Sequence, residues 1–124
     1  MTDVDARPAA APIVAASVSA AVASALPGFL VGALAVQMRS EFDVGESVYA
    51  WAMSAYFLAA SFVSIPLGRV AQRIGPRHQI VTALTVGAGA NLLIAAGARS
   101  FGVLVAIMAV IGVCNAAAQT AVNL

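Results

Sequence analysis

Residues 68–78 read GRVAQRIGPRH, and this basic segment separates two long stretches that contain no charged residue. The stretches, residues 47–68 and 79–98, each supply the roughly 20 residues that a helix needs to cross a hydrocarbon core of about 30 Å. A short basic connector between two such stretches is typical of a helical hairpin that spans a membrane. The segment therefore indicates a membrane protein rather than a soluble domain.

Two further charge-free stretches flank this hairpin. One covers residues 8–38 and the other 101–124, with polar connectors at 39–47 and 99–100. Strands standing alone would leave backbone groups unpaired in lipid, so each stretch is expected to be helical. The sequence predicts an all-α integral membrane fold with four transmembrane helices: a tail over residues 1–8, then a transmembrane domain over 9–124 with helices at about 11–38, 48–68, 77–98 and 101–124.

The composition supports this class of fold and argues against several functions. Hydrophobic residues make up 62% of the chain and charged residues 9%, against about 25% charged residues in a typical soluble protein. There is no lysine and the arginines are dispersed, so a nucleic-acid partner is not expected. Cys114 and His78, the single cysteine and histidine, have no neighbours at a metal-ligand spacing, and no nucleophile–base pair is visible. We therefore expect no metal, no cofactor and no enzymatic activity.

The distribution of arginines predicts the orientation of the chain. The N-terminal tail and the second connector share one side of the membrane, which holds more arginines than the other side: Arg7, Arg69, Arg73 and Arg77 against Arg39 and Arg99. By the positive-inside rule, we expect a multi-pass protein of the cell membrane with its N-terminus in the cytoplasm.

Residues 13–23 also fit the apolar region of a signal peptide, with Ala23-Ser24-Ala25 as a small-residue cleavage site. The leader before them is acidic rather than basic, and the apolar run continues to Met38. Both features favour a membrane helix over a cleaved signal.

Small residues recur at four-residue spacing in every predicted helix. Such pairs let helix backbones approach closely, which favours helix association in lipid. They indicate packing and carry no information about a substrate. The pairs are Gly28/Gly32, Ala55/Ala59, Ala83/Gly87 and Gly112/Ala116.

The connector over residues 68–78 has a simple physical interpretation. Gly68 is expected to end one helix, and Gly75-Pro76 to break the chain and start the next helix. Arg73 and Arg77 can pair with lipid phosphates or with carboxylates elsewhere in the protein. On these grounds alone, the segment is a cytoplasmic loop that obeys the positive-inside rule.

The same segment is similar to the loop between helices two and three of the major facilitator superfamily. That pattern runs glycine, any residue, apolar, small, aspartate, arginine, any residue, glycine and then basic residues; it is matched by Gly68, Val70, Ala71, Arg73, Gly75, Arg77 and His78. Gln72 stands in place of the aspartate, and Pro76 stands where a basic residue is common. Residues 51–58, WAMSAYFL, also resemble the second helix of that family.

The resemblance implies that the chain is the first part of an N-terminal six-helix bundle. The implied function is transmembrane transport of a small solute by alternating access, as part of a full-length permease. The implied partners are the lipid bilayer, a small-molecule substrate and the missing C-terminal helices of the same transporter. The chain ends inside an apolar stretch at Leu124, so we expect a truncated sequence.

The resemblance also implies that the connector acts as a conformational switch. In the family, the loop aspartate contacts a helix N-terminus in the other half of the transporter. The corresponding residues here are Gly68, Gln72, Arg73, Gly75 and Arg77. Gln72 keeps a hydrogen-bonding group but brings no charge, so a weaker latch is expected.

Amides form a polar stripe on the fourth predicted helix. Asn115, Gln119 and Asn123 recur every four residues and so share one face. Two interpretations remain open, namely hydrogen bonds to another helix or the wall of a cavity that touches substrate. The resemblance implies the cavity wall, since helices one and four line the central cavity in that family. Ser17 and Ser24 on the first helix are then candidates for the facing wall.

None of the four apolar stretches contains an acid, a lysine, an arginine or a histidine, so the segment offers no group for a proton relay. Met108 stands where many proton-coupled drug antiporters of the family have an arginine. Two alternative functions are a small four-helix multidrug exporter that acts as a dimer and a non-transporting membrane assembly subunit. The exporter requires a glutamate in its first helix, but no acid occurs between Asp5 and Glu41.

Overall fold

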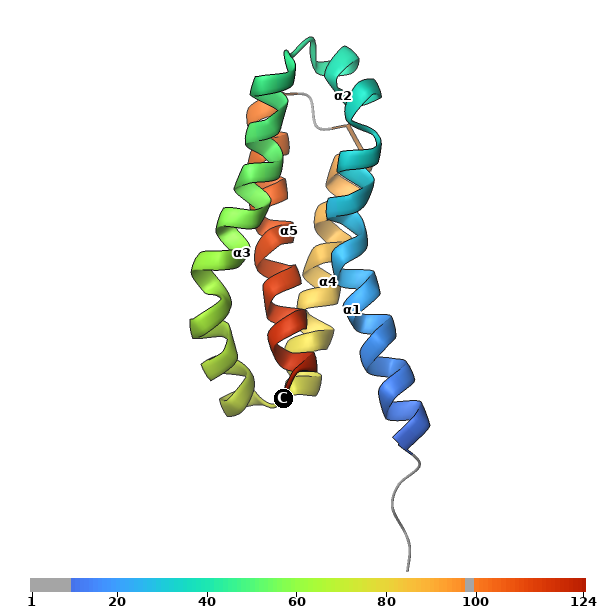
Figure 1. Cartoon of the computed structure of the whole chain (residues 1–124), viewed down its shortest axis with the longest axis vertical. Coiled ribbons are helices and arrows are strands. Elements are labelled where there is room, and N and C mark those ends of the chain that lie inside the picture. The colour runs from blue at the N-terminus through green and yellow to red at the C-terminus, as the bar shows by residue number, and fades with distance from the viewer. Residues whose placement is uncertain (1–9, 98–99) are drawn as a thin grey trace, which may run out of the picture.

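A computed structural model of the chain describes residues 10–97 and 100–124. This part of the chain is helical, without strands, and four of its helices are long and apolar enough to cross a membrane. The expected tail over residues 1–8 and Arg99 of the last connector lie outside the described residues. The prediction of an all-α membrane fold is confirmed. The helices in chain order are α1 (Ala10–Ala33), α2 (Ala35–Phe42), α3 (Glu46–Ile74), α4 (Pro76–Ala95) and α5 (Phe101–Val122), as Figure 1 shows.

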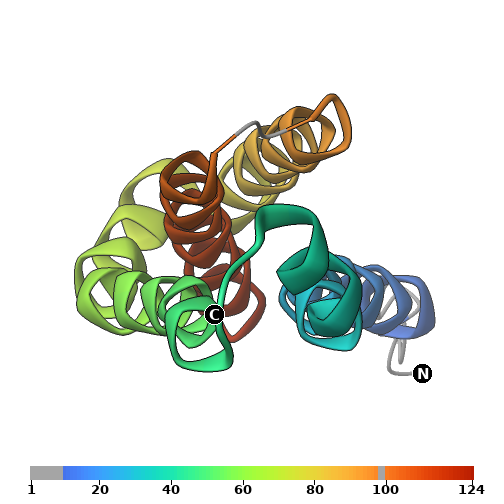
Figure 2. The same cartoon turned by 90° about the horizontal axis from the view of Figure 1, so that it is seen from above.

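The helix α5 lies at the centre of the bundle and packs on α3, α4 and α1 (Figure 2). Its most buried side chains, Leu104, Met108 and Ile111, form the middle of the hydrophobic core. The start of α1, the α3–α4 turn and the end of α5 lie at one end of the bundle, and α2 lies at the other (Figure 1). The helices therefore alternate in direction, as short connectors require.

Two glycines allow the central helices to approach closely. A Cβ atom at Gly112 of α5 would overlap the backbone carbonyl oxygen of Tyr56 in α3. A Cβ atom at Gly28 of α1 would lie 2.9 Å from Cζ of the same tyrosine ring. Tyr56 is thus held between α1 and α5, where only glycine leaves enough room, as expected for packing between small residues.

The first apolar stretch is not one continuous helix. It was expected to be helical from residue 11 to 38, but α1 ends at Ala33 and α2 begins at Ala35. At this break, the hydroxyl of Tyr49 donates a hydrogen bond to the Val31 carbonyl over 2.8 Å. A side-chain donor that hydrogen-bonds to a helix carbonyl in this way interrupts the series of backbone hydrogen bonds along the helix. The sequence did not indicate this break because Tyr49, which donates the hydrogen bond, lies on a different helix, α3.

The connector over residues 68–78 also differs from the expectation. Gly68 does not end a helix, because α3 continues through it to Ile74. Gly75 is the residue that turns the chain: its φ of 86° is favourable only for glycine, and its N–H donates to the Ala71 carbonyl. Pro76 then begins α4 at the first helical position, where a missing N–H costs nothing. A glycine inside a helix costs only about 1 kcal/mol relative to alanine, so Gly68 alone does not stop α3.

Candidate functional site

The residues expected to form a conformational switch surround the turn between α3 and α4. Gln72, Arg73 and Arg77 are exposed at this end of the bundle, whereas Gly68 and Gly75 are half-buried. The arginines project from the last turn of α3 and the first turn of α4. The turn therefore presents positive charge and one uncharged amide to whatever lies next to this end of the bundle.

Gln119 of the polar stripe joins α5 to α1. Its Nε2 donates to the Ala21 carbonyl over 3.2 Å and to the Ser24 hydroxyl oxygen over 3.4 Å. The Ser24 hydroxyl in turn donates to the Ala21 carbonyl over 2.9 Å. The stripe and the first helix thus meet at Ser24 and Gln119, and the amide nitrogen of Gln119 is fully used in joining them.

Asn115 lies one turn before Gln119 and faces a cavity between α1, α3 and α5. The cavity has a volume of about 500 Å³. The Oδ1 atom of Asn115 is buried and has no hydrogen-bond partner among the described residues. No charged side chain lines the cavity in this part of the chain. Its lining residues are Ala25, Gly28, Phe29, Gly32, Ala33, Met53, Tyr56, Phe57, Asn115 and Gln119.

Two of the expected cavity residues lie elsewhere. Asn123 is exposed where α5 ends, and it lies about 12 Å along the helix axis from Asn115. Ser17 lines a separate cavity beside Pro76 and Arg77, at the end of the bundle where α1 diverges from α5 (Figure 1). A shared helix face does not place residues at the same depth, which explains why the stripe is split.

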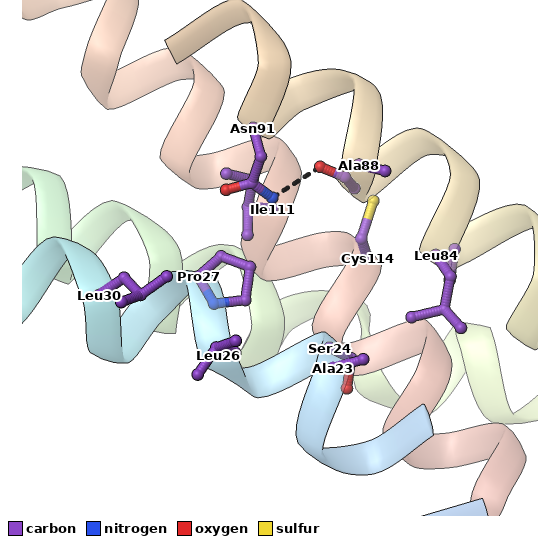
Figure 3. Close-up of a pocket in the computed structure, with 12 residues that line it drawn as sticks. Ala23, Ser24, Leu26, Pro27, Leu30, Leu84, Ala88, Asn91, Ile111 and Cys114 are labelled. Atoms are coloured by element: carbon purple, nitrogen blue, oxygen red, sulfur yellow. Dashed lines mark hydrogen bonds between the residues drawn. The ribbon is translucent and has the colours of Figure 1, made fainter. Parts of the chain in front are cut away.

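A second cavity, of about 450 Å³, lies between α1, α4 and α5 (Figure 3). Its wall is almost entirely apolar, with Pro27 and Leu30 of α1 on one side and Leu84 and Ala88 of α4 on another. The side-chain amide of Asn91 donates to the Gly87 carbonyl of its own helix over 2.8 Å. The amide nitrogen of Asn91 is engaged in this way, whereas its oxygen has no hydrogen bond among the described residues.

Gln79 is a buried polar residue that the sequence reasoning missed. Only 4% of it is exposed, and its Nε2 donates to the Ala117 carbonyl over 2.9 Å and to the Thr120 hydroxyl oxygen over 3.2 Å. It thereby joins the start of α4 to the end of α5, directly after the basic turn. The signal was present in the sequence as an amide next to His78, at the start of an otherwise apolar stretch.

The buried parts of the described helices contain no obvious group for ion coupling. Within residues 10–97 and 100–124, no cluster of His, Cys, Asp or Glu could hold a metal ion. Met108, at the position compared above with an antiporter arginine, is completely buried in the core and does not line the cavity beside Asn115.

Comparison of the sequence with models of known protein families identifies the family of this chain. The sequence matches the family model of the Major Facilitator Superfamily over residues 13–124. The chain belongs to the major facilitator superfamily. Members of this superfamily are transporters rather than enzymes, so the general function of the chain is solute transport across a membrane, as a multi-pass protein in contact with the bilayer. Comparisons with curated proteins and with solved structures found no significant match.

The family assignment confirms the resemblance inferred from residues 68–78. It does not favour the two alternatives considered above, the small four-helix exporter and the non-transporting assembly subunit. In chain order, the four candidate membrane spans are α1, α3, α4 and α5, and α2 is a short helix between the first two.

Proposed function

We propose that the chain forms the opening four membrane helices of a permease that moves a small solute by alternating access. The observation that carries this proposal is the cavity between α1, α3 and α5, whose lining residues include the polar side chains Asn115, Gln119 and Tyr56. The first and fourth membrane helices, α1 and α5, both contribute to its wall. They are tied together by the hydrogen bonds of Gln119, which keep the two walls in register.

The remaining helices of the permease are the partners proposed for α1. One side of α1 exposes large apolar side chains, and α1 packs less extensively than α3 or α4 on α5. Further helices or lipid can cover this surface without leaving polar groups unpaired. The exposed apolar residues are Ile13, Val14, Val18, Val22, Leu26, Phe29 and Leu30.

The turn between α3 and α4 is proposed to lie in the cytoplasm and to act as a latch against the other half of the permease. The start of α1 and the turn between α3 and α4 lie at the same end of the bundle (Figure 1). Arg73 and Arg77 flank this turn, so the positive-inside rule predicts one side of the membrane for the turn and the N-terminus together. The proposed location is the cell membrane, with the N-terminus in the cytoplasm. Gln72 is exposed on this surface and can donate or accept a hydrogen bond there.

Alternating access can be tested by thiol labelling in the full-length permease that carries this segment. In a background with Cys114→Ala, we introduce Asn115→Cys in the cavity and, as a control, Leu92→Cys on the exposed apolar surface of α4. A membrane-impermeant thiol reagent should modify the cavity cysteine from each side of the membrane, and a transported solute should shift the balance between the sides. Leu92→Cys should not react. A cavity cysteine that reacts from neither side, or whose sidedness never changes, contradicts the proposal.

A further inference from the structure

We propose that a groove between the start of α1, the start of α4 and the end of α5 binds an anionic phospholipid of the bilayer. The lipid places its phosphate on Arg77 and part of one acyl chain in the groove. This groove, called the Arg77 groove below, has a volume of about 660 Å³ and shares no lining residue with the cavity beside Asn115. The proposal concerns the side of the bundle and does not depend on the proposed transport function.

The wall of the Arg77 groove changes from charged to apolar with depth in the membrane. Arg77 is the only charged side chain among the described residues that line it, and Ser17 is the only uncharged polar one. Arg77 is the second residue of α4 and lies at the edge of this span, whereas Ile80 and Val81 follow about one turn deeper. On α1, Ser17 lies about 6 Å deeper along the helix than Ile13. A phospholipid has the same order of groups, with its phosphate at the edge and its acyl chains below.

The groove is open towards the surroundings of the bundle. Ile13 and Ala16 of α1 and Val81 of α4 are exposed, and α1 diverges from α5 at this end (Figure 1). Such an opening between membrane helices is covered either by lipid or by another helix. An apolar helix would cover the wall without supplying a counter-charge for Arg77. A phospholipid supplies both an acyl chain for the wall and a phosphate for the guanidinium group.

The distribution of charge along the bundle favours an anionic lipid at this end. The described acidic residues, Glu41, Asp43 and Glu46, lie in or beside α2 at the opposite end, together with the ion pair between Arg39 and Glu46. Among the described residues, the end that holds the groove therefore carries positive charge without a carboxylate. Basic pockets between membrane helices bind anionic headgroups for this reason. The basic residues at this end are Arg69, Arg73, Arg77 and His78.

The two parts of the groove contribute differently to binding. An acyl chain gains little when it moves from the bilayer into the groove, because its surroundings are apolar in both places. The apolar wall therefore positions the lipid, whereas Arg77 discriminates between headgroups. One arginine near the membrane surface is expected to favour an anionic lipid by about fivefold. The Ser17 hydroxyl can donate a hydrogen bond to an ester carbonyl of the same lipid.

Photolabelling by lipids tests the proposal in the full-length permease that carries this segment. The permease is placed in phosphatidylcholine nanodiscs that contain a minor fraction of a photoactivatable lipid, either phosphatidylglycerol or phosphatidylcholine with the same acyl chains. One acyl chain carries a diazirine near its ester group. Irradiation expels dinitrogen, and the resulting carbene inserts into a neighbouring C–H bond. Labelled residues are then identified by mass spectrometry.

The anionic lipid should label residues 13–20 and 80–81 about fivefold more than the zwitterionic lipid. Arg77→Gln should lower this ratio to about one, whereas the control Arg73→Gln should preserve most of it, because Arg73 lies at the same end but outside the groove. Ala16→Leu should reduce labelling by filling the groove. Its control, Ala15→Leu, is also exposed but lies outside the groove and should not reduce labelling.

Equal labelling of the groove by the two lipids in the unsubstituted permease overturns the proposal, whatever the variants show. An equal loss of preference in Arg77→Gln and Arg73→Gln also overturns it, because the preference would then arise from diffuse surface charge. If neither lipid labels the groove while other parts of the protein are labelled, another part of the permease covers the groove and the proposal is wrong. Both leaflets of the nanodisc have the same composition, so the result does not depend on the orientation of the chain.

Discussion

Replacing Gly112 by alanine tests how closely α5 must approach α3. The added Cβ atom would overlap the Tyr56 carbonyl oxygen and would lie 2.9 Å from the carbonyl carbon and 3.0 Å from Cα of Tyr56. These atoms belong to the backbone of a long helix and cannot rotate away, so α3 and α5 must separate. Overpacking of this kind typically costs about 1–3 kcal/mol. The separation also weakens the contacts around Met108, which lies one turn earlier on α5.

The matched control is Gly89→Ala in α4, because a Cβ atom at Gly89 would meet nothing within 4 Å. This control should gain helix propensity, by up to about 1 kcal/mol, without any clash. Both variants replace a glycine inside a helix by alanine, so the gain in helix propensity is common to them, and the difference in the free energy of unfolding is expected to be about 1–3 kcal/mol.

The assay is reversible unfolding of the chain in mixed micelles by titration with a denaturing detergent, followed by circular dichroism. Gly112→Ala should unfold at a lower fraction of denaturing detergent than the unsubstituted chain, and Gly89→Ala at an equal or higher fraction. If the two variants unfold at the same point, the close contact between α5 and the Tyr56 backbone does not stabilise the bundle, and the packing argument fails.

Three further predictions concern single polar contacts. Tyr49→Phe should lower the free energy of unfolding by about 0.5–1.5 kcal/mol in the same assay, because the Val31 carbonyl loses its partner, while the exposed Trp51→Phe should change little. Gln79→Leu should destabilise the chain by a similar amount, about 0.5–1.5 kcal/mol, because two hydrogen bonds to α5 are lost. Removal of the unpaired side-chain oxygen of Gln79 offsets part of this loss. The control Gln72→Leu, at an exposed position, should leave the free energy of unfolding unchanged. In the full-length permease, Gln72→Asp should shift the sidedness of thiol labelling in the cavity by about two- to fivefold, as expected for a charge near a helix N-terminus, and unchanged sidedness would refute the latch.

The polar stripe shows how far sequence reasoning could identify the candidate site. The four-residue spacing correctly places Asn115 and Gln119 on one face of α5, and the choice of Ser24 as the facing residue agrees with the hydrogen bond that it accepts. The same spacing could not separate these residues from Asn123 and Ser17, because spacing defines a face but not the depth at which two helices meet. That depth depends on where α1 diverges from α5 (Figure 1).

Other features depend on partners that are distant in the sequence. The break between α1 and α2 coincides with a hydrogen bond from Tyr49, and Gln79 is held by residues near the end of α5. Each residue taken alone is an ordinary member of an apolar stretch. No local pattern reveals that its polar group is buried against another helix.

The sequence by itself determined the membrane class, the four spans, the turn at Gly75-Pro76 and the family. The first three depend on local composition, charge spacing and backbone preference, which do not require knowledge of the neighbours. The family rests on the resemblance of residues 68–78 and on the match to the family model over residues 13–124. Only the tertiary structure decided where the helices touch, since the contact of Gly28 and Gly112 with Tyr56 sets the rotation and depth of α1, α3 and α5. In the resulting arrangement, Asn115 lies beside a cavity and Gln119 donates to α1, whereas Asn123 is exposed at the end of α5.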